Sequence, residues 1–367
     1  MPTHSEIPIF PSKAISADDD AVVIEPYRGS NAELQAFVES TWTAAYRGLI
    51  SYPLWSTEYF DWQLDSSTEA DRRLCARHNG RLVAVLMGAG TRFRTPTRSF
   101  FGAHYSWLSV ASEFRGMRLA QRLDEARIHL EKSVGSELIV SYRFTGSRHS
   151  LAERPTPHKP KFHQRIGLWG RQLQGSRLKK WNLNKVEGLL GFAGMPLLPR
   201  IDWPSRSPHV RLFEQIDLGQ CLNIVERSAD QFALTIDWDE SSLQQQLSGS
   251  PITQTVVWER QGTVQGFVNF HILPFRAGTL EPVGIIDMIE VREMTLRDQS
   301  ALLKSCLGLM RSQGAVVALK LRCGDVSNLL MLRTGFTPRL KDSHLVLQSP
   351  EQSVQIPRRS PMQLLWR

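Results

Sequence analysis

The stretch Tyr105–Gly135 constrains the fold of this chain more than any other part. Apolar residues alternate at its start, which is typical of a strand, and recur every three or four residues from Leu119 onward, which is typical of a helix. A strand that leads through a short turn (111–118) into a helix brings the free N–H groups of the helix start together, at the positive end of the helix dipole. Arg115 and Arg118 add positive charge to this turn. The sequence therefore predicts an anion site, for which phosphate is the usual ligand.

The size and charge of the chain limit the number of domains and the classes of partner to expect. It has 367 residues, which predicts two domains, and a net charge of +8. A basic chain favours a nucleotide cofactor, an acidic substrate, an anionic lipid or nucleic acid, although an ordinary basic surface would carry the same charge. Because lysine and arginine are spread along the chain without a dense patch, nucleic acid is the least favoured of these partners.

The cysteines and the termini indicate the compartment. The four cysteines lie far apart and no C-x-x-C pair occurs, so we expect no metal site. Cys75 and Cys306 sit among apolar neighbours, which is typical of reduced core cysteines. The first residues lack a signal-peptide pattern, and no apolar run is long enough to span a bilayer. We therefore expect a cytoplasmic location.

The first half of the chain reads as alternating strands and helices. Its clearest local signal is the pair Asn79-Gly80, which is typical of a type I′ hairpin turn. Beyond Tyr105–Gly135, we predict strands at Ala21–Glu25, Leu74–His78, Arg81–Gly88, Ser99–His104 and Glu137–Phe144, helices at Ala32–Thr41 and Glu58–Leu64, a helix end at Phe162–Gly167, and a closing hairpin at Leu168–Gln174 and Leu178–Leu183.

The same order of elements starts again after residue 208. We predict strands at Val210–Ile216, Thr255–Arg260, Val264–Ile272, Val283–Val291, Ala315–Leu321 and His344–Gln348, and helices at Leu218–Glu226, Asp239–Leu247, Leu296–Arg311 and Asn328–Phe336. This indicates a diverged repeat. The expected units are a flexible arm (1–19), a first domain (20–185), an apolar connector (186–207), a second domain (208–350) and a basic tail (351–367). The connector fits either a surface linker or a flap over an apolar substrate or lipid.

The turn after the central strand carries a recognisable motif. It reads V-x-x-E-F-R-G-x-x-L-A from Val110 to Ala120, and it resembles the acyl-CoA-binding signature of the GNAT acyltransferase superfamily, in which a Q/R-x-x-G-x-G/A loop cradles the CoA pyrophosphate. Arg118 stands where that motif has its middle glycine. The resemblance implies that acyl-CoA is bound by Leu108, Ser109, Val110, Arg115, Gly116, Met117, Arg118, Leu119 and Ala120. The second half has Arg292–Ser300 at this turn and lacks the motif, so we expect one CoA site.

Arg118, which departs from the GNAT motif, indicates a resemblance to a narrower group within the superfamily. Tandem GNAT chains with R-x-x-R-L-A at this turn resemble the protein N-myristoyltransferases, and several further segments look similar: Ser56–Leu64, Asn79–Gly88, 155–167, Gly266–Pro274 and Leu345–Gln348. This implies a mixed α/β fold of two tandem GNAT-like domains, each a twisted, mostly antiparallel sheet flanked by helices.

The resemblance also implies catalytic positions. Backbone amides of Trp107 and Leu108 would stabilise the oxyanion, and His163 stands where the family often has a general acid. In N-myristoyltransferases the base is the carboxylate of the last residue, just after a strand like Leu345–Gln348. Here 19 residues follow Gln348 (367 minus 348), so that carboxylate cannot simply be carried over. Asp287 and Glu290 are the alternative bases, and Glu113 is expected to shape the turn.

The expected function is therefore acyl-CoA-dependent N-acylation, with acetyl-CoA or a longer acyl-CoA as donor and a small-molecule or peptide amine as acceptor. The alternative is an inert GNAT-fold protein that binds CoA or serves as a scaffold. Membrane contact through residues 186–200 is a further alternative that we do not favour. The sequence leaves the acceptor and the oligomeric state open.

Overall fold

The computed structural model describes residues 22–64, 72–144, 162–183, 193–204, 207–339, 343–351 and 354–367. Its helices are α1 (Asn31–Tyr46), α2 (Thr57–Leu64), α3 (Leu119–Ser133), α5 (Gly175–Trp181), α7 (Leu218–Ala229), α8 (Glu240–Ser248), α9 (Leu296–Ser312) and α10 (Asn328–Arg333), with short 3-10 turns η1 (Ser112–Phe114), η2 (Met195–Leu197) and η3 (Gln215–Asp217).

The strands are β1 (Val22–Pro26), β2 (Tyr52–Pro53), β3 (Leu74–His78), β4 (Arg81–Thr95), β5 (Arg98–Val110), β6 (Leu138–Phe144), β7 (Phe162–Ile166), β8 (Leu168–Gln172), β9 (Val210–Leu212), β10 (Leu234–Ile236), β11 (Thr253–Arg260), β12 (Thr263–Arg276), β13 (Leu280–Glu290), β14 (Val317–Leu321), β15 (Thr337–Pro338), β16 (Ser343–Gln348) and β17 (Met362–Gln363).

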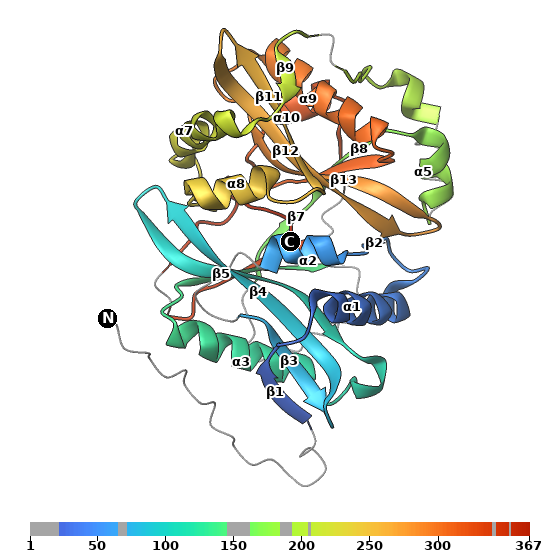
Figure 1. Cartoon of the computed structure of the whole chain (residues 1–367), viewed down its shortest axis with the longest axis vertical. Helices are drawn as coiled ribbons and strands as arrows, with labels where there is room; N and C mark the ends of the chain where they lie inside the picture. Colours follow the sequence, from blue (N-terminus) through green and yellow to red (C-terminus); the bar gives the residue numbers. More distant parts are fainter. Residues whose placement is uncertain are drawn as a thin grey trace.

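The strands form two sheets with helices around them (Figure 1). Sheet A has the order β1-β3-β4-β5-β6-β16-β7, with β10 beside β4 and β17 beside β10. Sheet B has the order β15-β8-β14-β13-β12-β11-β9, with β2 beside β12. Most pairs are antiparallel, and β5–β6, β13–β14 and β10–β17 are parallel. The predicted fold of two mostly antiparallel sheets flanked by helices is confirmed.

Each sheet takes strands from both halves of the chain. β16, from the second half, lies between β6 and β7 in sheet A. β8, from the first half, lies between β14 and β15 in sheet B. The predicted hairpin at Leu168–Gln174 and Leu178–Leu183 is therefore wrong, because residues 175–181 form helix α5 and β8 pairs in sheet B. The predicted helix end at Phe162–Gly167 is also wrong, because Phe162–Ile166 is strand β7. The proposed domain boundaries stay a prediction.

Local turn chemistry is as predicted where the signal was strong. Asn79 and Gly80 have φ of 50° and 79°, which a type I′ turn between β3 and β4 requires. Ser30 caps α1, accepting the Glu33 N–H through its hydroxyl. Several boundaries differ. The predicted strand Ser99–His104 and the following strand are a single strand, β5, helix α1 runs on to Tyr46, and β4 runs on to Thr95. The predicted strand Val210–Ile216 ends at Leu212, and residues 215–217 form η3.

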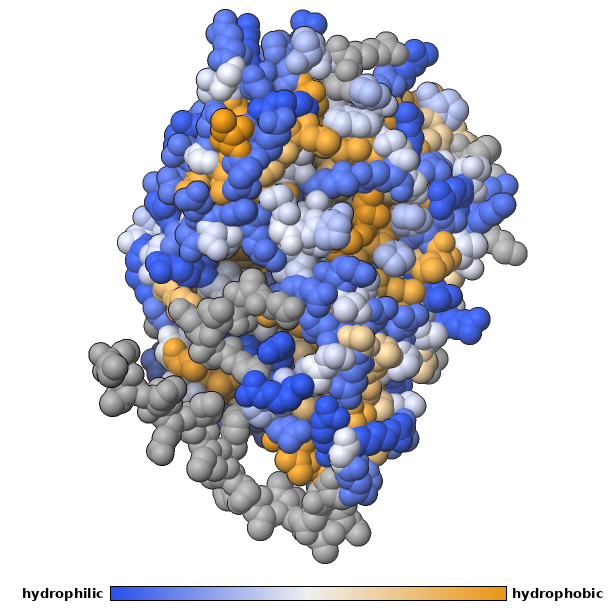
Figure 2. All heavy atoms as spheres, viewed as in Figure 1, coloured by the Kyte–Doolittle hydropathy of each residue, from blue (hydrophilic) through white to orange (hydrophobic). Residues whose placement is uncertain are grey.

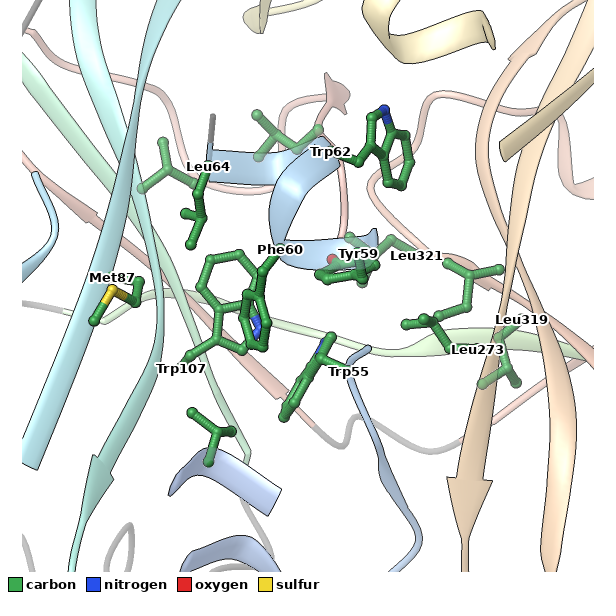
Figure 3. Close-up of a cluster of buried hydrophobic side chains, with 14 of the residues drawn as sticks. Trp55, Tyr59, Phe60, Trp62, Leu64, Met87, Trp107, Leu273, Leu319 and Leu321 are labelled. Atoms are coloured by element: carbon green, nitrogen blue, oxygen red, sulfur yellow. The ribbon is translucent and has the colours of Figure 1, made fainter. Parts of the chain in front are cut away.

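Helix α2 fills the space between the two sheets. In Figure 3 its aromatic side chains lie between Met87 and Trp107 of sheet A on one side and Leu273 and Leu319 of sheet B on the other. One buried apolar cluster therefore runs through both sheets. The face seen in Figure 2 is largely hydrophilic, with apolar side chains between the hydrophilic ones. Within the described residues, no helix has the length and apolarity needed to cross a membrane.

Candidate active site

Strand β5 bends at Trp107. Ala84 and Val85 of β4 pair with Val110 and Ser109, but Met87 pairs with Ser106, so β5 carries one extra residue at this point. Trp107 takes up that extra residue with φ of 55°, a left-handed conformation that is uncommon for any residue except glycine. A bulge of this kind turns backbone groups away from the regular ladder, and such strained positions concentrate at functional sites.

Beyond the bulge, β5 separates from its neighbour β6. Their parallel ladder pairs Gly102–Tyr105 with Leu138–Ser141 and, within the described residues, does not continue past Tyr105. β6 continues to Phe144, where it pairs with β16 on its other edge. The β6-facing backbone of residues 106–110 is therefore not used in that ladder. The oxyanion site expected at Trp107 and Leu108 stays a prediction.

The turn after β5 leads into a helix start without a side-chain cap. Arg118 is the N-cap of α3, with φ of 56° and ψ of 22°, and its side chain makes no capping hydrogen bond. No acidic residue lies in the first turn of α3. The first amides of a helix have no intrahelical partner, so those of α3 are free to bind an anion. Gly116 has φ of 94°, and a Cβ placed there would meet no atom within 4 Å, so the turn is open at this point.

The corresponding helix of sheet B is closed to an anion. Thr295 caps α9 by accepting the Asp298 N–H, and Asp298 itself lies in the first helical turn. The Thr295 hydroxyl donates to the Asp298 carboxylate at 2.9 Å. A carboxylate at this place occupies the positive end of the helix and repels a phosphate. Of these two helix starts, only that of α3 lacks a side-chain cap and an acidic residue, and the single phosphate site stays a prediction.

A buried ion pair holds α3 on sheet A. Glu131 of α3 is fully buried and accepts from Arg72 Nε at 2.9 Å and from the Tyr105 hydroxyl at 2.7 Å. The Ser136 hydroxyl donates to the same carboxylate. At the other end of the turn, Arg81 of β4 pairs with Glu113 at 2.5 Å. The far end of α3 and the start of the turn are therefore each held on the sheet by an ion pair.

The C-terminal segment returns to the centre of the molecule, as the C label in Figure 1 shows. β17 pairs with β10, and Leu364 and Leu365 are buried. The Tyr142 hydroxyl of β6 donates to the Leu365 carbonyl at 2.9 Å. The Ser106 hydroxyl, next to the Trp107 bulge, donates to the main-chain oxygen of Arg367 at 2.6 Å. The 19 residues after Gln348 thus bring the Arg367 main-chain oxygen to the point where β5 and β6 separate.

The side chain of Arg367 extends from there to sheet B. Its Nη2 donates to Gln246 Oε1 of α8 at 2.6 Å, and its guanidinium lies over the Trp62 ring of α2 at 5.2 Å. Arg367 Nη1 is 3.9 Å from Asp287 Oδ1 of β13. Asp287 Oδ2 accepts from the ring nitrogen Nδ1 of His271 at 2.6 Å, and both side chains are fully buried. Of the two alternative bases, Asp287 thus lies in the junction between the sheets.

Two further titratable groups near the junction have shifted pKa values. Burial, and then the Arg367 charge, lower the pKa of His104 on β5 to about 3, so its imidazole is neutral at pH 7. Burial raises the pKa of Glu290 on β13 to about 7. Glu290 accepts from the Gln363 amide of β17 and not from Arg367, so it lies apart from Asp287. Within the described residues, no group of histidine, cysteine and acidic residues could hold a metal ion.

The predicted site residues fall into two groups. Trp107 to Ala120 form one continuous segment of bulge, turn and helix start, in which Arg115, Gly116 and Arg118 are exposed. His163 belongs to strand β7 by its backbone, but its side chain lies outside the described residues, as do residues 184–192 of the connector. Sequence reasoning missed His271, Gln246 and Arg367. The apolar L-L-W before Arg367 was the one signal that the tail is buried.

Comparisons with solved structures agree with this geometry. Two crystal structures of Saccharomyces cerevisiae N-myristoyltransferase with bound myristoyl-CoA match with TM-scores of 0.74 and 0.75 at 15% identity, over 97% and 98% of this chain and 91% and 87% of those chains. The chain therefore shares the fold of these structures. A GCN5-related N-acetyltransferase from Anabaena variabilis matches with a TM-score of 0.53 at 10% identity, over 90% of this chain and 73% of that chain. No protein-family model and no curated protein sequence matches the chain.

Proposed function

We propose that this chain transfers an acyl group from acyl-CoA to an amine. The observation that carries the proposal is the continuity of Tyr105–Ala120: the bulge at Trp107, the end of the β5–β6 ladder and the uncapped start of α3 follow each other in one segment. An oxyanion site and a phosphate site so close in sequence fit a CoA thioester. The likeness to structures of N-myristoyltransferase with bound myristoyl-CoA supports this reading.

The donor would lie along this segment. The amides at the start of α3, with Arg115 and Arg118 beside them, would hold the pyrophosphate, and the exposed Gly116 lets it approach the backbone. Acyl-CoA supplies the activated thioester. Its carbonyl oxygen would accept hydrogen bonds from the amides of Trp107 and Leu108, which favour the negative charge of the tetrahedral intermediate. Collapse of that intermediate breaks the C–S bond and releases the CoA thiol.

The acceptor amine would approach between the sheets. The main-chain oxygen of Arg367 lies next to the bulge, where it can accept a hydrogen bond from the amine and orient it toward the thioester. This is the part of the site to which the family resemblance assigns a carboxylate base. The pKa of an amine lies above neutrality, so its ammonium form must first give one proton to solvent. The second proton, lost from the nitrogen after attack, passes to the CoA thiolate as the C–S bond breaks. The acceptor is a small-molecule or peptide amine, and the donor is acetyl-CoA or a longer acyl-CoA.

Binding and turnover test the proposal separately. Calorimetry with acetyl-CoA and myristoyl-CoA measures binding, and release of the CoA thiol in the presence of an amine measures transfer. Gly116→Trp places a bulky side chain at the open turn, where φ of 94° also strains it, and should abolish CoA binding. Gly135→Trp is the matched control at the other end of α3, because Gly135 also has positive φ, 69°, and an open Cβ position.

Two results would overturn parts of the proposal. If the wild-type protein binds neither acyl-CoA, the donor site is wrong. If it binds acyl-CoA but releases no thiol with any amine, the inert scaffold is the better reading. Equal loss of CoA binding in both tryptophan variants would mean that backbone strain, and not the site, explains the Gly116 result.

A further inference from the structure

The junction between the sheets contains a group of side chains suited to a cation. Gln246 Nε2 donates to Asn269 Oδ1 at 2.7 Å, which turns Gln246 Oε1 away from Asn269 and toward Arg367. Asp287 Oδ2 accepts from His271 and from Gln246 Nε2, which leaves its other oxygen, Oδ1, for a further partner. The Trp62 indole supplies an aromatic face beside them. Carboxylate, amide oxygen and aromatic face all attract positive charge.

Several buried polar atoms at this place lack a hydrogen-bond partner. They include Asp287 Oδ1, Arg367 Nη1 and His271 Nε2. The first two are 3.9 Å apart, which is too long for a hydrogen bond. Asp287 and His271 are fully buried, so each unpaired atom costs free energy that a bound group could recover. The unpartnered His271 Nε2 is a further polar atom that a bound group could contact.

Arg367 lies at the edge of this group. Its Nη2 donates to Gln246 and its guanidinium lies over the Trp62 ring. The guanidinium also faces the Tyr59 hydroxyl and pairs loosely with Asp287 at 3.9 Å, and the side chain is 11% exposed. It is thus the member of the group nearest to solvent, and its movement would uncover Asp287. Its main-chain oxygen meanwhile lies against Ser106 at the proposed reaction centre. The length of one arginine side chain therefore separates the reaction centre from the cation site.

We propose that Trp62, Gln246 and Asp287 form a subsite for a second positive charge on the acceptor, and that the Arg367 guanidinium fills this subsite until the acceptor enters. The acceptor is then a diamine, a polyamine or a basic peptide, whose second cation lies one arginine side chain from the amine that is acylated. The role of this subsite in acceptor binding rests on the proposed acyl transfer. Binding of a cation to the subsite can be tested without acyl transfer.

Chemical complementation gives the direct test. Ethylguanidinium reproduces the end of the Arg367 side chain, and calorimetry measures its binding. Arg367→Ala should bind it at least about tenfold more tightly than the wild-type protein, whose subsite is filled. Arg367→Lys keeps a cation in the subsite and should not gain this affinity. Arg358→Ala, which removes an exposed arginine of the same tail, is the matched control and should behave like the wild type.

The negative charge of the subsite is tested in a double variant. Adding Asp287→Asn to Arg367→Ala should abolish the gained affinity, with thermal unfolding used to show that the variant is folded. If Arg367→Ala binds ethylguanidinium no better than Arg358→Ala, the subsite does not exist. If Arg367→Lys gains as much affinity as Arg367→Ala, the side chain is a structural strut and not an occupant.

Turnover then connects the subsite to the reaction. Arg367→Ala should lower the KM for a diamine by about tenfold and leave the KM for the monoamine of the same length unchanged. An equal change for both amines would refute the role in acceptor selection. Absence of thiol release with every amine would refute the acyl transfer alone, because the ethylguanidinium result stands independently of it.

Discussion

Arg118→Gly restores the residue that the GNAT motif has at this place, and its effect on stability can be worked from the backbone. Arg118 is exposed and has φ of 56° and ψ of 22°. This left-handed conformation costs a non-glycine residue about 1–2 kcal/mol. Glycine avoids that cost but adds about 0.5–1 kcal/mol of chain entropy to the unfolded state. We therefore expect the free energy of unfolding to rise by between about 0 and 1.5 kcal/mol, which is the strain relieved minus the added chain entropy.

The same variant should weaken CoA binding. It removes one exposed positive charge from the start of α3, and exposed charge pairs are worth about 0.2–1 kcal/mol. That corresponds to a loss of up to about fivefold in affinity at low salt. The loss should shrink as salt is added, because salt screens exposed charges. Calorimetric titration with CoA at two salt concentrations measures both quantities.

Gln261→Gly is the matched control for backbone strain. Gln261 has φ of 53°, is exposed and precedes Gly262 in the β11–β12 turn, away from α3. It should change stability as Arg118→Gly does and leave CoA affinity unchanged. Tighter CoA binding by Arg118→Gly would refute the reasoning, because it would show that the arginine side chain obstructs the phosphate site.

Two further predictions concern buried charges. The pKa of Glu290, raised to about 7 by burial, lies above its ordinary value of 4.5, so the folded protein keeps this proton longer than the unfolded chain, and stability falls as the pH rises through that window. Glu290→Gln, which cannot ionise, should exceed the wild type in stability at pH 8 by about 3 kcal/mol more than at pH 4. Urea denaturation at both pH values checks this, and equal pH dependence in the two proteins would contradict it. Glu131→Gln leaves the Arg72 guanidinium buried without its carboxylate and should cost about 3–5 kcal/mol in urea denaturation. The double variant Arg72→Met/Glu131→Leu should recover most of this loss, and a double variant as unstable as the single one would argue against an ion-pair origin.

The sequence by itself determined what depends on neighbouring residues. The Asn79-Gly80 turn, the apolar alternation of β5 and the helical spacing of α3 all lie within short windows, and the structure has each of them. The motif from Val110 to Ala120 is also continuous, so its strand, turn and helix could be placed without any tertiary information. The resemblance carried by that motif led to the GNAT fold, which the comparisons support.

Tertiary structure decided what depends on residues far apart in the chain. β8 and β16 exchange sheets, and no local pattern records which strand a segment will pair with, because the pairing follows from burial of both faces. Residues 145–161 separate β6 from β7, yet β16 is the strand that joins them. The predicted hairpin failed for this reason.

The residues on the acceptor side of the site depend most on the tertiary structure. Gln246, His271, Asp287 and Arg367 come from α8, β12, β13 and the end of the chain, and only His271 lies in a segment that carries the family resemblance. They meet because α2 fills the core between the sheets and the tail folds back over it. The strand, turn and helix start at Tyr105–Ala120 could be read from the sequence, because a continuous segment carries its own backbone geometry. The cation site could not, because it exists only where two sheets and the tail come together.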